Sequence, residues 1–484
     1  MEQTVTYRKV PLWQVILGQL KNGAQMAFYV LINMIAYLGS GGYGIDTILV
    51  GTILTFSRIF DGVIDPFLAV AIDRFNTKHG KIRYLLIIGF CIRACSVLLL
   101  YNIFSNGKHG IVMFILLYLL QIVGNSIYDI VSNMVPAVMT NDPKQRPSIE
   151  VWGTVYSYLF PTIFTVLSTF ILLPRYNNEY TVPFLRSAAL MFVGFAAVLT
   201  LIAIIGLGPI DKPENFKGIS ASEEDDDVSM KDMAKFLKEN KPFRLYTISC
   251  VAEKLAQNVT SQAIITNMIF GILIGNIQFG TMLTVVSMLP AIVFAIIGAK
   301  HAGKAGSLEA NLIWTKICVA VTVLTLVFCT VIDMRSISGN IIMTVLFFVM
   351  LLVSNGARMC TTTASGAMRA DIVDYELERS GKYLPAVVTA TYNFIDQLVT
   401  SLGATIATLG VSLIGYRNTL PQPTDAPTPA IKGMALFLYF GLPLLTWIAA
   451  LIALRGYHLT KDEMVRVQQT IAARRSEEAE PSAE

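Results

Sequence analysis

The chain has 484 residues, of which 54% are hydrophobic and 14% are charged, and its formal net charge is +4. Because a soluble domain carries roughly 25% charged residues, this composition excludes a soluble globular protein and indicates a membrane protein. The small net charge, without a Lys/Arg-rich run interleaved with aromatic residues, argues against nucleic acid as a partner.

Twelve apolar runs are each long enough to cross a membrane as a helix, since about 20 residues span a ~30 Å hydrocarbon core. The first six lie at Trp13–Leu38, Thr47–Ile72, Leu85–Phe104, Ile111–Met139, Val151–Leu173 and Ser187–Leu207. The other six lie at Phe243–Ile274, Phe279–Ala299, Leu312–Ile332, Ile341–Met368, Tyr383–Ile414 and Met434–Leu454. We therefore predict an all-α polytopic membrane protein with 12 transmembrane helices. The first run has no small-residue cleavage site, so we expect it to stay in the mature chain.

A long polar interruption divides the twelve runs into two sets of six. It contains the acidic run Glu223–Asp227, which we interpret as a solvated loop, and the amphipathic stretch VSMKDMAKFLKEN. We predict an N-terminal six-helix bundle at 1–208, a cytoplasmic linker with an amphipathic helix at 209–242, a C-terminal six-helix bundle at 243–455, and a polar cytoplasmic tail at 456–484 that frays into solvent. Paired bundles are typical of alternating-access carriers.

The distribution of Lys and Arg predicts the orientation in the membrane. Short loops after even-numbered spans carry 11 of these residues, whereas loops after odd-numbered spans carry 6. The positive-inside rule then places both termini and the linker in the cytoplasm. We expect a monomeric, multi-pass protein of the plasma membrane. Its six cysteines lie in apolar runs without a CxxC pair, which predicts free thiols packed as small hydrophobic side chains.

Carboxylates in the second and fourth spans are candidate functional groups, because a charge at bilayer depth costs roughly 2.5–3.5 kcal/mol on insertion scales. Asp61 and Asp65 are four residues apart, which places both on one helical face. They would repel each other unless a cation or a base lay between them. An ion pair between Arg58 and Asp61 is the alternative. In the fourth span Asp129 lies about one turn after Ser126. Carboxylates and hydroxyls are the ligands that small hard cations prefer.

Other ionisable residues also lie at membrane depth. They are Arg93 in the third span, Glu253 and Lys254 in the seventh, Arg358 in the tenth and Asp396 in the eleventh. Asp396 could form an ion pair with either Arg358 or Lys254, and the sequence does not choose between them. For each charge the alternatives are a structural pair between helices and direct contact with a polar substrate. The sequence indicates no organic cofactor and no metal beyond a coupling cation.

Four stretches of the chain resemble one transporter family. The segment RIFDGVIDPFLAVAIDRFNTKHGKIRYLLIIG is similar to the second span and following loop of the glycoside–pentoside–hexuronide:cation symporters, the melibiose-permease family of the major facilitator superfamily. DIVSNMVPAVMTNDPKQR, VSMKDMAKFLKENKPF and MRADIVDYELERSGK match in order and spacing. The resemblance implies the major facilitator fold, with its two six-helix bundles.

The resemblance also implies a site for Na⁺, H⁺ or Li⁺ among acidic residues of the second and fourth spans. By motif match its residues are Asp61, Asp65 and Asp129, with Ser126 at the hydroxyl position. The same matching implies a cytoplasmic gate of charged groups, for which ordinary solvated loop charge is the alternative. Its members are Arg146, Asp371, Asp374 and Arg379.

The positions that bind sugar in melibiose-type members differ here. Those members carry an acidic residue early in the first span, an aromatic ring below the fourth-span carboxylate, an arginine in the fifth span and a lysine in the eleventh. The corresponding positions are KNGAQM at Lys21–Met26, Asn133, Trp152-Gly153-Thr154 and Gln397. We therefore expect a cavity of mostly neutral hydrogen-bonding side chains, with Asp129 shared between cation and substrate. The candidate substrate-binding residues are Lys21, Asn22, Gln25, Tyr128, Asp129, Asn133, Trp152, Asn393 and Gln397.

Together these features predict a secondary active transporter and not an enzyme. We expect symport of a glycoside or related polar sugar-like solute with Na⁺ or H⁺, by alternating access. A cation-coupled carrier of a non-sugar or lysolipid-like solute is the alternative. A channel would show unitary currents. A membrane enzyme is disfavoured because the sequence lacks a Ser/His/Asp set and an HExxH motif.

Overall fold

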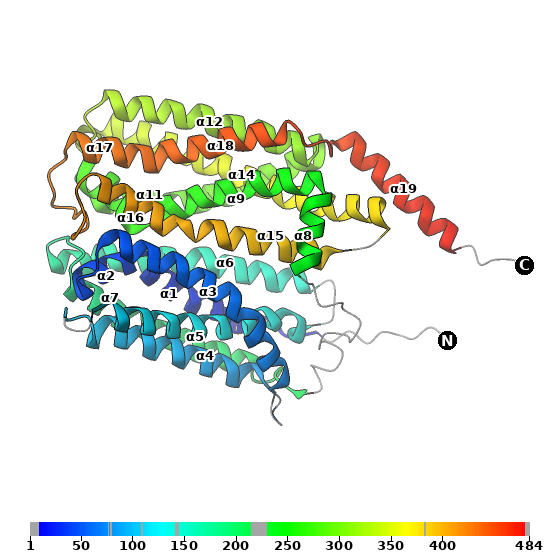
Figure 1. The fold of residues 1–484 in the computed structure, drawn as a ribbon, viewed down its shortest axis with the longest axis horizontal. Helices are drawn as coiled ribbons and strands as arrows, with labels where there is room; N and C mark the ends of the chain where they lie inside the picture. The colour runs from blue at the N-terminus through cyan, green and yellow to red at the C-terminus, as the bar shows by residue number, and fades with distance from the viewer. Residues whose placement is uncertain are drawn as a thin grey trace, which may run out of the picture. The chain divides into compact units, whose positions relative to one another are not determined.

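The computed structural model of the chain is built from helices in the residues that it describes (Figure 1). These are residues 9–75, 77, 80–107, 110–140, 145–213, 230–381 and 384–479. The chain forms two compact units. Unit 1 comprises Met1–Asp225, Gln262–Asn267 and Ala404–Ala426, and unit 2 comprises Asp226–Ser261, Met268–Gly403 and Pro427–Glu484. Two short stretches from the second half of the chain therefore belong to unit 1. The predicted domain boundaries stay a prediction.

Unit 1 consists mainly of long apolar helices joined by short connections. They are α1 (Leu12–Asn33), α2 (Ile35–Tyr43), α3 (Thr47–Arg74), α4 (Ile82–Leu98) with the π-helical η1 (Leu99–Ile103), α5 (Gly110–Met139), α6 (Arg146–Val166) with η2 (Leu167–Leu172) and η3 (Leu173–Tyr176), α7 (Val182–Leu207), and from the second half α10 (Ala263–Thr266) and most of α16 (Leu402–Leu413). α1 packs against α6 and α7, and α5 packs against α3 and α4.

Glycines let two of these helix pairs approach closely. A Cβ on Gly206 of α7 would lie 2.7 Å from the backbone nitrogen of Gly18 in α1. A Cβ on Gly124 of α5 would lie 2.6 Å from the backbone nitrogen of Arg93 in α4. In lipid there is no hydrophobic driving force for helices to associate, so they associate through van der Waals packing. Small residues at the contact allow the backbones to approach and improve that packing. The α4–α5 contact, visible in Figure 1, fixes the position of Arg93 relative to α5.

A buried aspartate after α7 caps the start of α4. Asp211 Oδ1 accepts hydrogen bonds from the backbone nitrogens of Lys81 and Ile82 at 3.0 and 3.1 Å, and Oδ2 accepts one from that of Arg83 at 2.9 Å. The Arg83 side chain adds an ion pair at 3.2 Å. Because the first N–H groups of a helix have no partner within the helix, this carboxylate both satisfies them and complements the helix dipole.

The stretches of unit 1 that come from the second half of the chain are attached to α2 and α3. Thr405 Oγ1 of α16 donates to the carbonyl of Gly51 at 2.8 Å. The carbonyl of Pro421 accepts hydrogen bonds from Tyr37 Oη at 2.8 Å and from Asn267 Nδ2 at 2.7 Å. These contacts are polar and largely buried, so they hold the loop after α16 in a defined conformation.

Unit 2 contains the linker helix and the remaining long helices. They are α8 (Met230–Glu239), α9 (Lys241–Ser261), η5 (Asn267–Leu273), α11 (Ile277–Ala305), α12 (Ser307–Val331), α13 (Arg335–Gly339), α14 (Ile341–Ser380), α15 (Pro385–Thr400), α17 (Pro429–Leu436), η6 (Phe437–Gly441), α18 (Leu442–Leu454) and α19 (Lys461–Ala479). α14 packs against α11 and α12, and α9 packs against α15 and α18. At 40 residues α14 is about 60 Å long, roughly twice the thickness of a hydrocarbon core.

Nine helices of the described chain are long and apolar enough to cross a membrane, or up to eleven if two bent pairs count as one span each. The difference from the twelve predicted runs lies at the seventh and eighth. The predicted span Phe243–Ile274 is broken at Gln262, and its first part, α9, is 21 residues long but too polar to qualify. The first predicted span is bent by 49° between α1 and α2.

Two other expectations need correction. The tail was expected to fray, but Lys461–Ala479 form the helix α19, which packs against α14 and buries Val467 and Ile471 one turn apart. Apolar residues at this spacing lie on one face of a helix, and that face can be buried against a neighbouring helix. All six cysteines are free, but Cys91 and Cys95 are exposed instead of packed inside, because they lie on the outer face of α4.

Candidate functional site

The carboxylates of α3 lie against α5, and Ser126 joins the two helices. Ser126 Oγ donates a hydrogen bond to Asp61 Oδ1 at 2.6 Å, and both side chains are buried. Ser126 also lies beside Asp65, one turn further along α3. Asp65 Oδ1 is buried and has no hydrogen-bond partner among the described residues. Two nearby carboxylates and a hydroxyl form a hard oxygen ligand set, and an unpartnered buried carboxylate oxygen calls for a cation or a proton.

Asp129 has different surroundings from the two carboxylates of α3. Gln25 Nε2 from α1 donates to Asp129 Oδ1, and Asn125 Nδ2 donates to Oδ2 at 2.8 Å. Its charge still interacts with those of Asp61 and Asp65. In the described part of the chain no three His, Cys, Asp or Glu side chains converge as metal ligands. Asp129 therefore has amide partners of its own while its charge still acts on the pair on α3.

Arg93 places a buried positive charge beside these carboxylates. Its side chain is 2% exposed, and its guanidinium lies 4.1 Å from the ring centroid of Phe28 on α1. Its charge interacts first with Asp129 and more weakly with Asp61. Arg58 is half-buried and near enough for its charge to act on Arg93. The carboxylates are thus partly compensated by fixed cations, which lowers the cost of enclosing them.

Several predicted substrate-binding residues of the first helix form a chain of hydrogen bonds. Lys21 Nζ donates to Asn22 Oδ1 at 3.1 Å, and Asn22 Nδ2 donates to Gln19 Oε1 at 3.0 Å. Tyr128 Oη donates to the carbonyl of Lys21 at 3.2 Å. A Cβ on Gly153 of α6 would lie 2.8 Å from Asn22 Nδ2, so α6 approaches this chain closely.

Two predicted residues lie apart from that chain in the contacts of the described residues. Asn133 is exposed on α5, about one turn beyond Asp129. The half-buried Trp152 packs with its ring 5.8 Å from that of Tyr156. The structure therefore brings Lys21, Asn22, Gln25 and Tyr128 to the surroundings of Asp129. Trp152 packs against the hydrophobic cluster that includes Tyr128.

A second group of intramembrane charges lies in unit 2. Of the two partners that the sequence left open for Asp396, the structure pairs it with Lys254, at 2.8 Å. The charges that act most strongly on Glu253 are those of Arg358 and then Lys254. Asn393 is exposed and Gln397 is half-buried on the same helix as Asp396.

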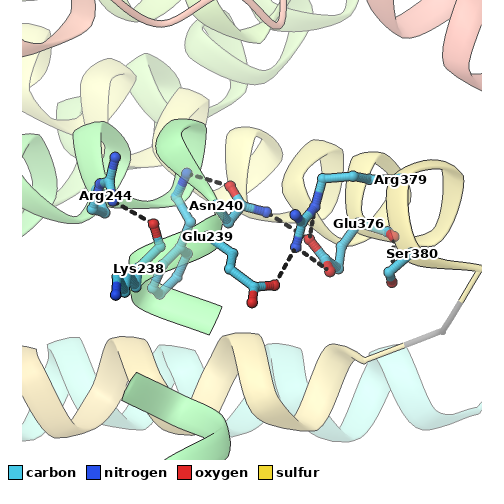
Figure 2. A network of polar contacts seen from close by, with 8 residues as sticks. Lys238, Glu239, Asn240, Arg244, Glu376, Arg379 and Ser380 are labelled. Carbon is cyan, nitrogen blue, oxygen red and sulfur yellow. Dashed lines mark hydrogen bonds and ion pairs between the residues drawn. The ribbon is translucent and has the colours of Figure 1, made fainter. Parts of the chain in front are cut away.

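The predicted cytoplasmic gate residues lie on the extension of α14. Figure 2 shows Arg379 bound to both carboxylate oxygens of Glu376, at 3.1 and 2.9 Å, and paired with Glu239 at 3.5 Å. Asn240 Nδ2 donates to Glu376 Oε2 at 2.9 Å, and Asn240 Oδ1 accepts from the backbone nitrogen of Phe243, which caps α9. This network ties the linker helix α8 to α14.

The other acidic gate candidates also have partners within unit 2. Asp371 accepts a hydrogen bond from Ser307 Oγ, and Asp374 accepts one from Gln468 Nε2 of α19 at 2.7 Å. The side chain of Arg146 lies outside the described residues. The gate therefore stays a prediction.

Sequence reasoning missed several residues that hold the site together. Asn125 lies four residues before Asp129, a spacing that predicts contact on a helix, so it was detectable. Gln19 lies three residues before Asn22, a spacing that also predicts contact. Phe28 carried no comparable signal, because its role depends on how α1 packs against α4.

The comparisons with known proteins agree with this architecture. Residues 18–461 match the model of the MFS/sugar transport protein family. The putative glycoside/cation symporter YagG of Escherichia coli (strain K12) is 23% identical over 470 residues, covering 92% of each chain. The inner membrane symporter YicJ of the same organism is 24% identical over 444 residues, covering 89% of this chain and 88% of the relative.

Among solved structures, the nucleoside transporter NupG superposes with a TM-score of 0.63 at 13% identity, covering 91% of this chain and 99% of the other. At that identity the likeness shows the fold alone. The predicted major facilitator fold is confirmed, and the chain is a multi-pass membrane transporter of a small-molecule solute and not an enzyme. Matched over nearly its whole length, the chain belongs to the MFS/sugar transport protein family.

Proposed function

We propose that this transporter carries a glycoside or related sugar-like solute together with Na⁺ or H⁺. The observation that carries the proposal is the pair formed by buried Asp61 and half-buried Asp65, with the Ser126 hydroxyl between α3 and α5. The buried Oδ1 of Asp65 lacks a partner among the described residues. The relatives named as cation symporters support the coupling, and the name of YagG supports the solute class.

The proposed mechanism follows from the cost of burying charge. Two carboxylates close together in low dielectric repel each other, so the site is enclosed at lower cost once a cation or proton has neutralised part of its charge. Neutralising the carboxylates of α3 also changes the electrostatic potential at Asp129, because its charge interacts with both of them. Its amide partner Gln25 belongs to the helix that carries Lys21 and Asn22, so cation binding is communicated to the substrate-binding residues.

The proposal includes the protein's place in the cell. A monomer in the plasma membrane with both termini in the cytoplasm would take the solute up as the cation moves down its gradient. The excess of Lys and Arg in loops after even-numbered spans supports this orientation.

Transport into proteoliposomes tests the proposal. Purified protein is reconstituted, and entry of methyl β-D-glucopyranoside, methyl β-D-xylopyranoside and D-glucuronate is measured while the Na⁺ and pH gradients are varied independently. We expect one of these probes to accumulate against its gradient with one of the two ions. In Asp61→Asn and Asp65→Asn we expect uphill accumulation to be lost while the melting temperature stays near that of the wild type.

The opposite results have defined meanings. Uptake that ignores both gradients would reject coupling, and uphill uptake retained in both variants would reject the assigned carboxylates. If no sugar probe enters but a lysolipid raises the melting temperature, the solute class is wrong.

A further inference from the structure

Helix α9 is long enough to cross a bilayer but too polar to face lipid. Its 21 residues give a length of about 31 Å, yet it is not among the described helices that qualify as membrane spans by hydropathy. Four polar residues in its second half follow the three-to-four-residue spacing that places side chains along one face of a helix. They are Lys254, Gln257, Asn258 and Ser261.

Helix α15, which packs against α9, has a matching polar face. It is part of the candidate span Val387–Leu413. Five of its polar residues follow the same spacing, and they are Thr389, Asn393, Asp396, Gln397 and Thr400. Thr389, Asn393, Lys254 and Gln257 are exposed. Because polar groups exposed to hydrocarbon are costly, these exposed side chains favour contact with water or a polar solute over contact with lipid.

The ion pair between Lys254 and Asp396 joins these two faces and is itself partly exposed. The two side chains are 45% and 19% exposed, at an N···O distance of 2.8 Å. A pair that only braced two helices would have no need of an exposed ammonium at membrane depth. The exposure indicates a group that meets water or a solute.

The pair has hydrogen-bonding capacity that its neighbours in the structure do not use. The ammonium of Lys254 has three donors, of which one goes to Asp396 Oδ2. Asp396 Oδ1 is buried and accepts no hydrogen bond from the described residues. A donor and an acceptor side by side match two neighbouring hydroxyl groups, one accepting from the ammonium and one donating to the carboxylate.

The aromatic ring of Tyr392 contacts the ammonium of Lys254. Lys254 Nζ lies 5.1 Å from the ring centroid of Tyr392, and the guanidinium of Arg369 lies 4.1 Å from the same ring. Arg369 Nε also donates to Tyr246 Oη at 3.1 Å. Cation–π contacts of this kind fix the direction of a flexible lysine, so the ammonium is positioned before any solute arrives.

We propose that Lys254 and Asp396 form a solute subsite in unit 2 that binds two neighbouring hydroxyl groups of the transported molecule. The pair has no net charge, so the subsite favours a neutral sugar ring over a carboxylated one, which would compete with Asp396 for Lys254. This subsite rests on the proposed function, because it assumes a polyhydroxylated solute.

Two double variants separate binding from bracing. K254Q/D396N removes both charges but keeps groups of similar size that hydrogen-bond to each other. K254D/D396K restores an ion pair with its polarity reversed. R466Q, which removes the ion pairs of Arg466 on α19 with Glu378 on α14 and with Glu463, is the control for loss of an exposed pair. Each variant is assayed in proteoliposomes with the methyl glycoside that the wild type transports best, and its Na⁺-induced shift in melting temperature is measured.

We expect K254Q/D396N to raise KM at least about tenfold while the Na⁺-induced shift stays as in the wild type. K254D/D396K should restore the melting temperature but not KM. R466Q should match the wild type in both measurements. If the neutral double variant does not fold, K254R, which keeps the charge but changes the donor geometry, should still raise KM at a wild-type melting temperature.

A wild-type KM in K254Q/D396N, or full recovery of KM in K254D/D396K, would mean that the pair is only a brace and would overturn the subsite alone. Failure of the wild type to transport any of the glycosides would instead overturn the proposed function, and the subsite with it. Transport of D-glucuronate in preference to the neutral glycosides would also contradict the subsite while leaving sugar transport intact.

Discussion

The carboxylates of unit 1 differ in the chemistry of their hydrogen-bond donors. Asp129 is held by the amides of Gln25 and Asn125, one to each oxygen. An amide N–H only donates, so each of these two bonds is made to a lone pair of an Asp129 carboxylate oxygen. Asp61 is held by the hydroxyl of Ser126, which can donate to a carboxylate or turn a lone pair toward a cation. At residue scale, this difference in donors supports the proposal that the exchangeable ion binds beside Asp61 and Asp65.

Replacement of Ser126 by alanine tests that division of roles. Removing one hydroxyl deletes the 2.6 Å hydrogen bond to Asp61 and one candidate ligand, with little change in volume. We expect the apparent cation affinity to fall roughly 10- to 150-fold, as the loss of one hydrogen bond to a charged group implies. The measurement is the Na⁺ or H⁺ concentration that gives half-maximal uptake in proteoliposomes.

Ser132→Ala is the matched control for this variant. Ser132 is buried on the same helix, and its hydroxyl has no hydrogen-bond partner among the described residues. It should leave the half-maximal concentration unchanged. Equal effects of the two substitutions would show that Ser126 contributes only through the packing of α5.

At the scale of elements, the site depends on how closely α4 and α5 approach each other. Arg93 and Asp129 belong to different helices, and their charges interact because Gly124 lets the backbones come together. Gly89 makes the corresponding contact from α4, where a Cβ would lie 2.9 Å from the backbone nitrogen of Tyr128. The two glycines therefore determine the distance between α4 and α5, and with it the strength of the interaction between the charges of Arg93 and Asp129.

Gly124→Ala tests this dependence. The added Cβ would lie 2.6 Å from the backbone nitrogen of Arg93 in α4. A backbone atom cannot rotate away as the end of a flexible side chain can, so the two helices must separate. We expect a loss of about 1–3 kcal/mol, the usual range for overpacking a well-packed contact, together with reduced uptake. The measurements are the melting temperature in detergent and initial transport rates.

Gly194→Ala on α7 makes the same chemical change where nothing lies within 4 Å of the new Cβ. It should be neutral or slightly stabilising, because alanine is the better helix former. A neutral Gly124→Ala would show that the α4–α5 contact adjusts freely and does not position Arg93.

What the sequence could predict also depends on scale. Helix positions were accessible because length and hydropathy are local properties, and charges at membrane depth were accessible because their cost is local. The break at Gln262 and the docking of α19 were not, since they depend on contacts with distant segments. Likewise, the sequence named Lys254 and Arg358 as partners for Asp396, but only tertiary packing chose Lys254.

At the scale of the whole molecule, coupling requires that each ligand change the affinity for the other. The carboxylates of α3 and Asp129 interact electrostatically, so filling the cation site alters the field at the hydrogen-bonded chain of α1. Thermodynamic linkage then fixes a relation that does not depend on the transport pathway: if the cation tightens solute binding by some factor, the solute tightens cation binding by the same factor.

Equilibrium binding to the purified protein measures that relation. The dissociation constant of the transported methyl glycoside is determined by calorimetry with and without saturating cation, and that of the cation with and without saturating glycoside. We expect two equal factors, each roughly 5- to 150-fold, the range of ordinary coupling free energies. In Asp65→Asn, which leaves Asp129 and its amide partners in place, glycoside should still bind but without any response to the cation. If the two affinity ratios were unequal, the two ligands would also differ in their effect on folding or aggregation. If both affinity ratios were one in the wild type, Asp61 and Asp65 would bind their ion independently of the solute.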